Sequence, residues 1–378
     1  MRACDDVDST EGPVSSGSLD GVRVAHVGHF DPDYARNRIV RKALVRAGAT
    51  VLTIADPRPF ARRTPHLARQ LARSRCDAVV VGFPGHADVA SARLIGSARR
   101  VPVVFDAFVS LLETADDRGV GGASRRARAR LATEDRVACR LADLVLLDTA
   151  THARYFEETF RVPARKLRRI WVGADDEVMT RVPLVAGHGF RVFVYASFIP
   201  LHGLEHVVEA AHLLERAGEP VSVDIVGTGA TEAAVRALVA QRGVRSVTFL
   251  GARPYSELPS LIAASDVCLG IFGTSAKAGR VIPNKVFDAL AVGRPVITAD
   301  TPAAREVLTH GRDAWLCPPG DAAALAEALR VLRADVSLRA GLADRGHALF
   351  VREFSLDAIA RELLPVVLGA LGRSGSGA

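Results

Sequence analysis

Short apolar runs alternate with longer amphipathic segments along most of the chain. In the first half the runs have strand length and lie at residues 22–27, 50–54, 78–81, 101–105, 144–147 and 169–172. Helical segments separate most of them, and this alternation predicts a parallel sheet wrapped by helices. The pattern breaks in a stretch that contains Pro and Gly at 183–189, which is the predicted linker.

A second series of apolar runs follows the break, at residues 192–195, 221–226, 247–250, 267–271, 295–298 and 314–317. The two series predict an α/β chain with two Rossmann-like domains in tandem. A last helix is expected at roughly 356–371, with Ser355 as its N-cap. Ligands of open parallel sheets lie beyond the carboxyl ends of the strands, so two facing domains would form a cleft lined by loops.

The length and composition fit this organisation. A chain of 378 residues exceeds the size at which single cores split, and 49% hydrophobic with 24% charged residues is an ordinary soluble composition. No apolar run approaches the roughly 18 residues of a membrane span. Residues 1–20 predict a disordered leader, not an export signal, and we expect a cytoplasmic protein. The expected parts are the leader, domains at 21–185 and 186–352, and a final helix with a flexible tail at 353–378.

Cysteine, histidine and charge patterns narrow the chemistry. The 5 cysteines are scattered and the 11 histidines show no ligand spacing, so we expect reduced thiols, no metal and no cofactor. The net charge of +7 is compatible with an anionic ligand, nucleic acid or an acidic membrane surface. No nucleic-acid motif is present, so nucleic-acid binding is not expected.

One segment of the second half predicts a short helix between a loop and a buried strand. Pro283 fits the first helical turn, where Asn284 and Lys285 would leave backbone donors free. An anion there meets donors, the helix dipole and an ammonium. Asp288 lies about one turn beyond, where its carboxylate could accept hydrogen bonds from sugar hydroxyls. Gly293 ends the helix.

Glycines follow two other predicted strands. Gly227 and Gly229 resemble the start of a dinucleotide fingerprint, but Glu232 occupies the third glycine position and no acidic residue follows near Phe249, which disfavours NAD. The pair predicts a tight turn without a ligand or a turn that approaches a nucleotide, and both interpretations stay open. Gly203 lies between a strand and a helix, where its amide could meet a pyrophosphate.

Taken in order, these motifs resemble the GT-B glycosyltransferases, in particular the family 4 group that uses nucleotide-sugar donors. The similar stretches are 198–205, 225–229, 249–251, 255–259, 264–269, 279–298 and the closing Glu306, Gly311 and 318–321. They cover most of residues 190–350. The resemblance implies two Rossmann-like domains facing across a cleft, a C-terminal helix that crosses back, a nucleotide-sugar donor, retention of configuration and no metal requirement.

The chain departs from the family pattern at two places. Many family 4 enzymes hold the diphosphate with an Arg and a Lys in a loop where this chain has Ser197 and His202. The later member of the family's acidic pair matches Asp288, whereas the earlier one falls on Arg280. Arg280 could complement a diphosphate, or it is a solvated loop residue. The resemblance leaves Lys285, Asn284 and the helix N-termini to hold the donor phosphates.

Candidate residues of the first half are less specific. The run Asp33, Arg36, Asn37 and Arg38 is similar to one in some family 4 relatives, and its members are candidates for holding donor phosphate or acceptor, or are ordinary helix polarity. Asp106 follows a strand and is expected at the cleft, where many relatives carry a histidine. It could orient the acceptor hydroxyl or take its proton, or cap the sheet edge.

Two further segments concern the acceptor side. Asp117 and Arg118 resemble an Asp-Arg pair of the same relatives and are expected in an acceptor loop. A basic run at residues 125–130 could meet an anionic membrane or a lipid-linked acceptor, but Glu134 and Asp135 follow at once, so a solvated helix face is favoured over peripheral membrane contact.

The sequence therefore predicts a glycosyltransferase that moves a sugar from a nucleotide diphosphate to a hydroxyl or amine. Asp106 and Lys285 are the expected catalytic residues. The acceptor stays open among a small molecule, a lipid-linked compound and a natural-product scaffold. The alternative is a GT-B subunit that binds a nucleotide sugar or a partner without chemistry. A sugar-nucleotide epimerase would need acid and base residues that the sequence does not reveal.

Overall fold

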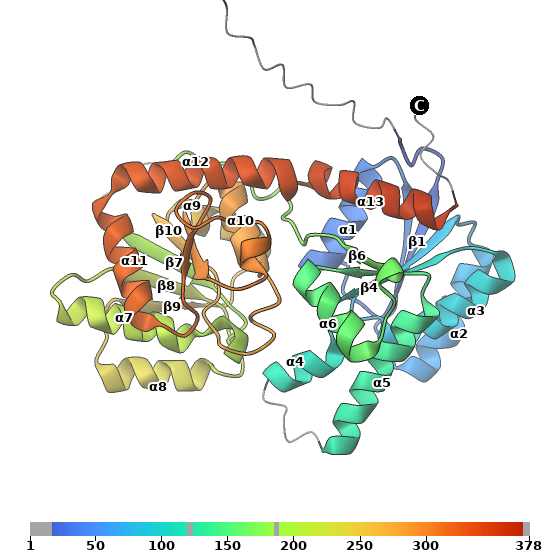
Figure 1. The fold of residues 1–378 in the computed structure, drawn as a ribbon, viewed down its shortest axis with the longest axis horizontal. Helices are drawn as coiled ribbons and strands as arrows, with labels where there is room; N and C mark the ends of the chain where they lie inside the picture. Colours follow the sequence, from blue (N-terminus) through green and yellow to red (C-terminus); the bar gives the residue numbers. More distant parts are fainter. Residues whose placement is uncertain (1–16, 119–123, 185–188, 373–378) are drawn as a thin grey trace, which may run out of the picture.

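The computed structural model describes residues 17–118, 124–184 and 189–372, and it contains two six-stranded parallel sheets. The sheets lie side by side, one in each half of the chain (Figure 1). This confirms the predicted two-domain α/β architecture. Most of the predicted leader, part of the predicted linker and the end of the tail lie outside the described residues.

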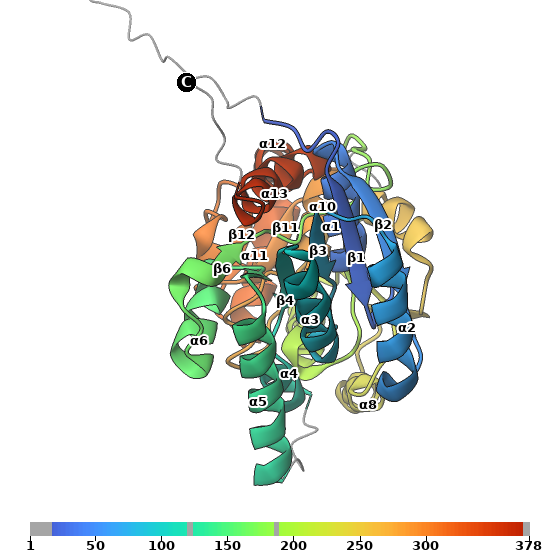
Figure 2. The same ribbon diagram turned by 90° about the vertical axis from the view of Figure 1, so that its right-hand side faces the viewer.

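The N-terminal sheet has the strand order β2-β1-β3-β4-β5-β6. Its strands are β1 (Arg23–Gly28), β2 (Thr50–Ala55), β3 (Ala78–Val81), β4 (Val103–Phe108), β5 (Leu144–Leu147) and β6 (Leu167–Arg169). Its helices are α1 (Ala35–Arg46), α2 (Phe60–Arg73), α3 (Val89–Arg99), α4 (Leu111–Asp117), α5 (Arg125–Leu141) and α6 (Ala150–Phe160). Seen from this half, α2, α3 and α5 lie in front of the strands and α13 runs above them (Figure 2).

The C-terminal sheet has the order β12-β11-β10-β7-β8-β9. Its strands are β7 (Arg191–Tyr195), β8 (Ser222–Val226), β9 (Val247–Gly251), β10 (Val267–Leu269), β11 (Val296–Ala299) and β12 (Trp315–Cys317). Its helices are α7 (Leu204–Arg216), α8 (Glu232–Arg242), α9 (Leu258–Ala263), α10 (Asn284–Val292), α11 (Ala322–Ala334) and α12 (Val336–Glu353). Short 3-10 helices are η1 (His86–Asp88), η2 (Ala164–Lys166), η3 (Pro200–His202), η4 (Tyr255–Glu257) and η5 (Ala304–Glu306).

Burial on both faces explains why the strands could be predicted from apolar runs in the sequence. Every residue of β3, β4 and β11 is buried, because helices cover both faces of a parallel sheet and the strands become continuous apolar runs. The exception is the run predicted at 169–172. Strand β6 ends at Arg169, and the next two carbonyls, of Ile170 and Trp171, accept hydrogen bonds from the Arg36 side chain.

The last helix crosses back to the first half, as predicted. Helix α12 runs along the C-terminal half, whereas α13 (Leu356–Ala370) packs against α1 (Figure 1). Ser355 caps α13, since its Oγ accepts from the backbone N of Ala358 at 3.2 Å. At the crossing point Phe354 is fully buried between Trp171 and Phe287, with ring centroids 5.7 and 4.7 Å away. Within the described ranges, no helix has the length and apolar character needed to cross a membrane.

Two loops at the carboxyl end of the C-terminal sheet touch backbone to backbone. Gly203 precedes α7 with φ +61°, and a Cβ added there would lie 2.5 Å from the N of Gly273 and 2.6 Å from the C of Phe272. Only a glycine permits this approach. Gly243 has nearly the same φ, +66°, but nothing lies within 4 Å of an added Cβ.

We expect Gly203→Ala to lower the free energy of unfolding more than Gly243→Ala does. Both variants carry the cost of a left-handed residue, about 1–2 kcal/mol. Gly203→Ala adds the displacement of a neighbouring backbone, about 1–3 kcal/mol more. Urea denaturation of both variants measures the difference. Equal losses would show that the two loops are not packed as described.

Candidate functional site

Helix α10 begins at Asn284, one residue later than predicted. Pro283 is its N-cap and has an extended backbone (φ −74°, ψ 149°), so it lies outside the first turn. No side chain caps this end, and although the N–H of Val286 donates to the carbonyl of Pro283, the N–H groups of Asn284 and Lys285 remain available to an anion. Gly293 ends the helix with φ +77°, as predicted.

The ammonium of Lys285 is buried at this end of α10 without a hydrogen-bond partner. The residue is 5% exposed, and its Nζ lies 5.8 Å from the centre of the Tyr195 ring. Burial lowers the pKa of Lys285 to about 7. A buried charge without a partner is costly, and an anion bound beside it would remove that cost.

Two other basic side chains approach the same place. His202, from η3, is buried and its Nδ1 has no partner. Burial, then Lys285 and Lys277, hold the pKa of His202 well below its usual value. The Lys277 ammonium donates to Thr114 Oγ1 of α4 at 2.8 Å, and burial lowers its pKa. We call these three residues, His202, Lys277 and Lys285, the basic pocket, because the two lysines act electrostatically on His202 near the start of α10.

Asp288 is buried beside two tyrosines. It is 2% exposed, and its carboxylate accepts hydrogen bonds from the hydroxyls of Tyr195 and, at 3.2 Å, Tyr255. Burial raises the pKa of Asp288 to about 7. The Lys285 ammonium lies over the Tyr195 ring, and the hydroxyl of Tyr195 donates to Asp288. Tyr195 thereby separates the two charged side chains of α10. Asp288 therefore belongs to a tyrosine cluster in this structure, and its contact with a ribose stays a prediction.

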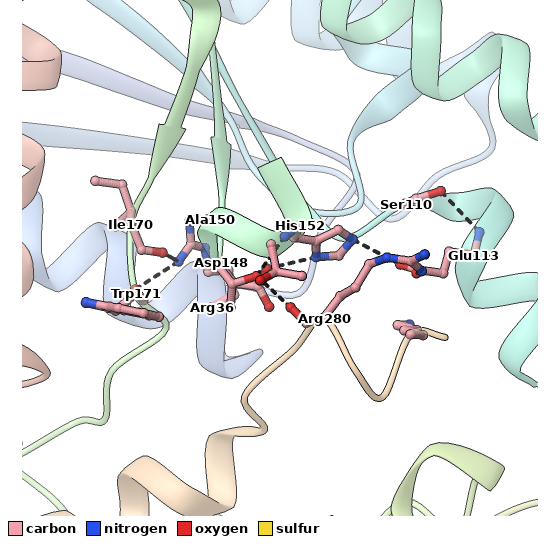
Figure 3. Close-up of polar contacts among 12 residues, drawn as sticks. Arg36, Ser110, Glu113, Asp148, Ala150, His152, Ile170, Trp171 and Arg280 are labelled. Carbon is pink, nitrogen blue, oxygen red and sulfur yellow. Dashed lines mark hydrogen bonds and ion pairs between the residues drawn. The ribbon is translucent and has the colours of Figure 1, made fainter. Parts of the chain in front are cut away.

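The expected acceptor base, Asp106, is buried inside β4. It and Arg36 of α1 are both 0% exposed, and the guanidinium donates to its two carboxylate oxygens at 2.9–3.0 Å. Arg36 also donates to the carbonyls of Ile170 and Trp171 at 2.8 and 3.0 Å (Figure 3). Neither Asp106 nor Arg36 reaches the cleft, because the two side chains form an ion pair inside the core.

The neighbours of Arg36 also have structural partners. Asn37 is buried, and its amide both donates to the carbonyl of Phe83 and accepts from its N–H, at 2.8 and 3.0 Å. Arg38 lies over the ring of Tyr255 at 4.0 Å, which joins the two halves of the chain. Asp33 is exposed, and its carbonyl accepts from Arg38. Asn37 is thus a clamp inside the first domain, not a cleft residue.

Close packing accounts for Gly227 and Gly229. A Cβ added at either position would lie 1.9 Å from a carbonyl oxygen of the loop after β7, that of Ala196 or Ser197 respectively. This arrangement favours the tight turn over a turn that approaches a nucleotide. With Gly203, these glycines bring the loops together behind the basic pocket.

A chain of alternating charges joins the two halves (Figure 3). His152 of α6 is fully buried between Asp148, 2.9 Å from its Nδ1, and Glu113 of α4, 3.0 Å from its Nε2. Burial acts to lower the pKa of His152, but the two carboxylates raise it to about 9. Glu113 also forms an ion pair with Arg280 of the C-terminal half.

This chain of charges changes the interpretation of Arg280. Its guanidinium is engaged by Glu113 and lies over the ring of Tyr155 at 4.3 Å, while its carbonyl accepts from Thr149 Oγ1. Burial acts to raise the pKa of Glu113, yet His152 and Arg280 hold it below the usual value. The charge predicted to complement a diphosphate is therefore neutralised from the opposite domain.

Sequence reasoning missed Glu113, His152 and Asp148. The signals were local and ambiguous, because Ser110 and Glu113 have capping-box spacing and Asp148 lies four residues before His152, just ahead of the N-cap of α6. Ser110 Oγ does accept from the N of Glu113, at 3.1 Å. The Glu113 carboxylate, however, turns toward His152 and Arg280, a contact that spans 167 residues of sequence.

A cavity of about 280 Å³ lies between α4 and the loop after β10. It is lined by Glu113, Asp116, Asp117, Tyr155, Ser275, Ala276, Lys277 and Arg280. Asp117 is 7% exposed, and its Oδ1 accepts from Ser275 Oγ at 2.6 Å while its Oδ2 has no partner. Asp117 thus lies at the interdomain cavity, whereas Arg118 is exposed at the end of α4. In the part of the chain described here, no group of His, Cys, Asp and Glu is placed to hold a metal ion.

The sequence of the C-terminal half is similar to a known family. Residues 190–335 match the family model of the glycosyl transferases group 1. The amylovoran biosynthesis glycosyltransferase AmsK of Erwinia amylovora is 29% identical over 170 residues, which cover 44% of this chain and 42% of AmsK. The putative colanic acid biosynthesis glycosyltransferase WcaL of Salmonella typhimurium is 28% identical over 206 residues, or 53% and 50% of the two chains. The chain spans about half the length of these curated relatives.

Solved structures share the fold of the whole chain. Sucrose-phosphate synthase from Thermosynechococcus elongatus superposes with a TM-score of 0.73 at 18% identity, covering 93% of this chain and 100% of that one. Anabaena HepE in complex with UDP and glucose gives a TM-score of 0.71 at 18% identity, covering 92% and 100%. The chain therefore has the GT-B fold, as the sequence predicted.

The pair of Arg36 and Asp106 should be required for folding. Arg36→Met leaves a buried carboxylate unpaired, and we expect a loss of about 3–5 kcal/mol in the free energy of unfolding. The double variant Arg36→Met with Asp106→Leu leaves no buried charge and should lose less. Arg93→Met, which breaks a half-exposed pair with Asp143, should lose about 1 kcal/mol or less. Denaturant unfolding that ranks Arg36→Met no worse than Arg93→Met would contradict this assignment.

Proposed function

From the GT-B fold and the basic pocket at α10, we propose that this chain transfers a sugar from a nucleoside diphosphate sugar to a hydroxyl or amine of an acceptor. The observation that carries the proposal is the Lys285 ammonium, which is buried at a helix N-terminus that no side chain caps and has no hydrogen-bond partner in the described part of the chain. An unpaired buried ammonium destabilises the ligand-free protein, and a bound anion removes this cost.

The same groups supply the catalysis. As the bond from the sugar to the diphosphate breaks, negative charge grows on the leaving phosphate while the sugar gains oxocarbenium character. Lys285 and the first-turn N–H groups of α10 are fixed in a water-poor setting before that charge appears, so they stabilise the transition state without reorganising. This mechanism assigns the developing charge to protein groups and requires no metal ion.

The finer assignments rest on resemblance. Family 4 membership and retention of configuration are implied by the sequence motifs, and NMR of the anomeric centre in the product tests retention. UDP in complexes of HepE makes a uridine nucleotide the first donor to examine. The relatives named for amylovoran and colanic acid biosynthesis favour a saccharide acceptor in polysaccharide assembly.

Lys285→Met should separate binding from stability. Loss of a charged contact to the diphosphate lowers the affinity for UDP by about 10- to 100-fold. The free energy of unfolding of the empty protein should stay the same or rise, because a buried unpaired charge is removed. Isothermal titration and denaturant unfolding measure the two quantities. Lys42→Met, which removes a partner of the buried Asp175 and the exposed Glu177, is the control and should leave UDP affinity unchanged.

Two results would oppose this part of the proposal. Undiminished UDP affinity in Lys285→Met would show that the ammonium does not hold the diphosphate. UDP binding in the wild type without turnover of any nucleotide sugar would favour a binding subunit that lacks chemistry.

Binding should also take up a proton above neutral pH. Because the pKa of Lys285 is about 7 in the empty protein, the side chain is mostly neutral at pH 8, and a bound diphosphate would raise its pKa and protonate it. We expect uptake approaching one proton per UDP at pH 8 and falling toward pH 6, where the ammonium is already charged. Calorimetry in buffers of different ionisation enthalpy measures the uptake. Lys285→Met should abolish it, and unchanged uptake in that variant would contradict the assignment.

A further inference from the structure

We propose that Glu113 of the N-terminal half, together with Asp117, binds the hydroxyls of the transferred sugar in the interdomain cavity. His152 and Asp148 then act as positioning residues behind Glu113. The inference rests on the proposed function and names the subsite for the donor's sugar.

The cavity offers hydrogen-bond acceptors. The carboxylates of Glu113, Asp116 and Asp117 line it together with the cations Lys277 and Arg280, and Asp116 and Glu113 are already paired with Arg128 and Arg280. Sugar hydroxyls can donate to the remaining lone pairs of these carboxylate oxygens. Asp117 Oδ2 is an acceptor at this cavity that has no hydrogen-bond partner among the described residues, although the residue is 93% buried. A buried acceptor left without a donor is costly, and a ligand hydroxyl would satisfy it.

The two sites are adjacent. Lys277 lines the cavity and donates to Thr114 of α4, and its charge acts on both His202 of the basic pocket and the carboxylates of Asp117 and Glu113. An anion-binding site beside a hydroxyl-binding site matches the diphosphate and the sugar of a nucleoside diphosphate sugar. The diphosphate would lie at Lys285 and the sugar at Glu113.

Glu113 supplies an acidic group that the donor-binding half lacks. Similar enzymes carry an acid where this chain has Arg280, and Glu113 reaches that very residue from α4 and pairs with it. The Arg280 guanidinium is held in place on the Tyr155 ring. The carboxylate at this point of the cavity therefore comes from the opposite domain, and the subsite is complete only while the two halves are in contact.

His152 keeps Glu113 in place as a carboxylate. Its Nε2 lies 3.0 Å from Glu113 Oε2, and Asp148 fixes the other ring nitrogen at 2.9 Å. A carboxyl group buried to this degree would otherwise favour its neutral form. With His152 on one oxygen and Arg280 on the other, the Glu113 carboxylate is held in a fixed orientation at the cavity, where its free lone pairs can accept from a ligand.

The test compares nucleotide and nucleotide-sugar binding with donor turnover. Titration uses whichever of UDP, GDP, ADP and dTDP stabilises the wild type most against heat, with its glucose conjugate, and hydrolysis of that conjugate reports turnover. We expect Glu113→Gln to keep affinity for the diphosphate within about twofold, because Lys285 is untouched, and to lose at least about tenfold in turnover and the added affinity that the sugar provides.

A relocated carboxylate provides the sharpest variant. Arg280→Glu alone brings two carboxylates together and should lose activity in the same way. Glu113→Gln combined with Arg280→Glu returns one carboxylate to the cavity from the other side and should recover turnover above either single variant. Asp117→Asn, which removes an oxygen with no protein partner, should fold normally and lose sugar-dependent affinity, so the inference can be tested even if Glu113→Gln is unstable.

His152 needs a control for packing. His152→Gln should lower kcat while leaving diphosphate affinity unchanged, whereas Phe156→Leu, which alters a ring packed 5.4 Å from His152, should change stability with little effect on kcat. Equal loss of kcat in both variants would reduce His152 to a packing role.

The outcomes distinguish a failure of the proposed function from a failure of the proposed sugar subsite. If no nucleoside diphosphate binds the wild type, the proposed function and this inference both fall. If the wild type binds and turns over a donor while Glu113→Gln and Asp117→Asn do so equally well, the inference is overturned and the proposed function stands.

Discussion

The ion pair between Arg280 and Glu113 determines how the two halves of this protein meet. It is the centre of a set of polar contacts that the C-terminal half makes with α4 and α6. Ser275 and Lys277 donate to Asp117 and Thr114 of α4. Glu306 accepts from the first N–H groups of α6, at 2.8 Å for Ala150 and 2.6 Å for Thr151. Because these contacts come from the loops that border α10, the shape of both the basic pocket and the cavity depends on them.

Some buried charged groups of the site have ion-pair partners among the described residues, whereas Lys285 does not. Glu113 and His152 are buried and compensated on each side, as expected when charges must be removed from water. Lys285 is buried to a similar degree without any compensation. Stability would be served by pairing it with Asp288, one turn away, yet Tyr195 lies between them. A charge kept unpaired at some cost to the empty protein indicates a ligand that arrives later.

Sequence patterns predicted the features that depend on neighbours along the chain. The strands, the end of α10 at Gly293 and the cap at Ser355 follow from local composition, and so does the position of Lys285 at a helix start. Local composition could not reveal the partners of Arg36, Asn37 and Asp106, because a polar residue beside a strand resembles a site residue until its partner is known. The partner of Asp106 lies 70 residues away, and burial converts both into core residues. The ion pair between Glu113 and Arg280 could not be predicted for the same reason, since it exists only after both domains have folded and docked.

The most direct test is a crystal structure of the protein with a nucleoside diphosphate sugar bound. The account predicts that a phosphate oxygen lies within hydrogen-bond distance of Lys285 Nζ and of the first N–H groups of α10. A well-defined diphosphate bound elsewhere on the chain, with the Lys285 ammonium still unpartnered, would contradict it.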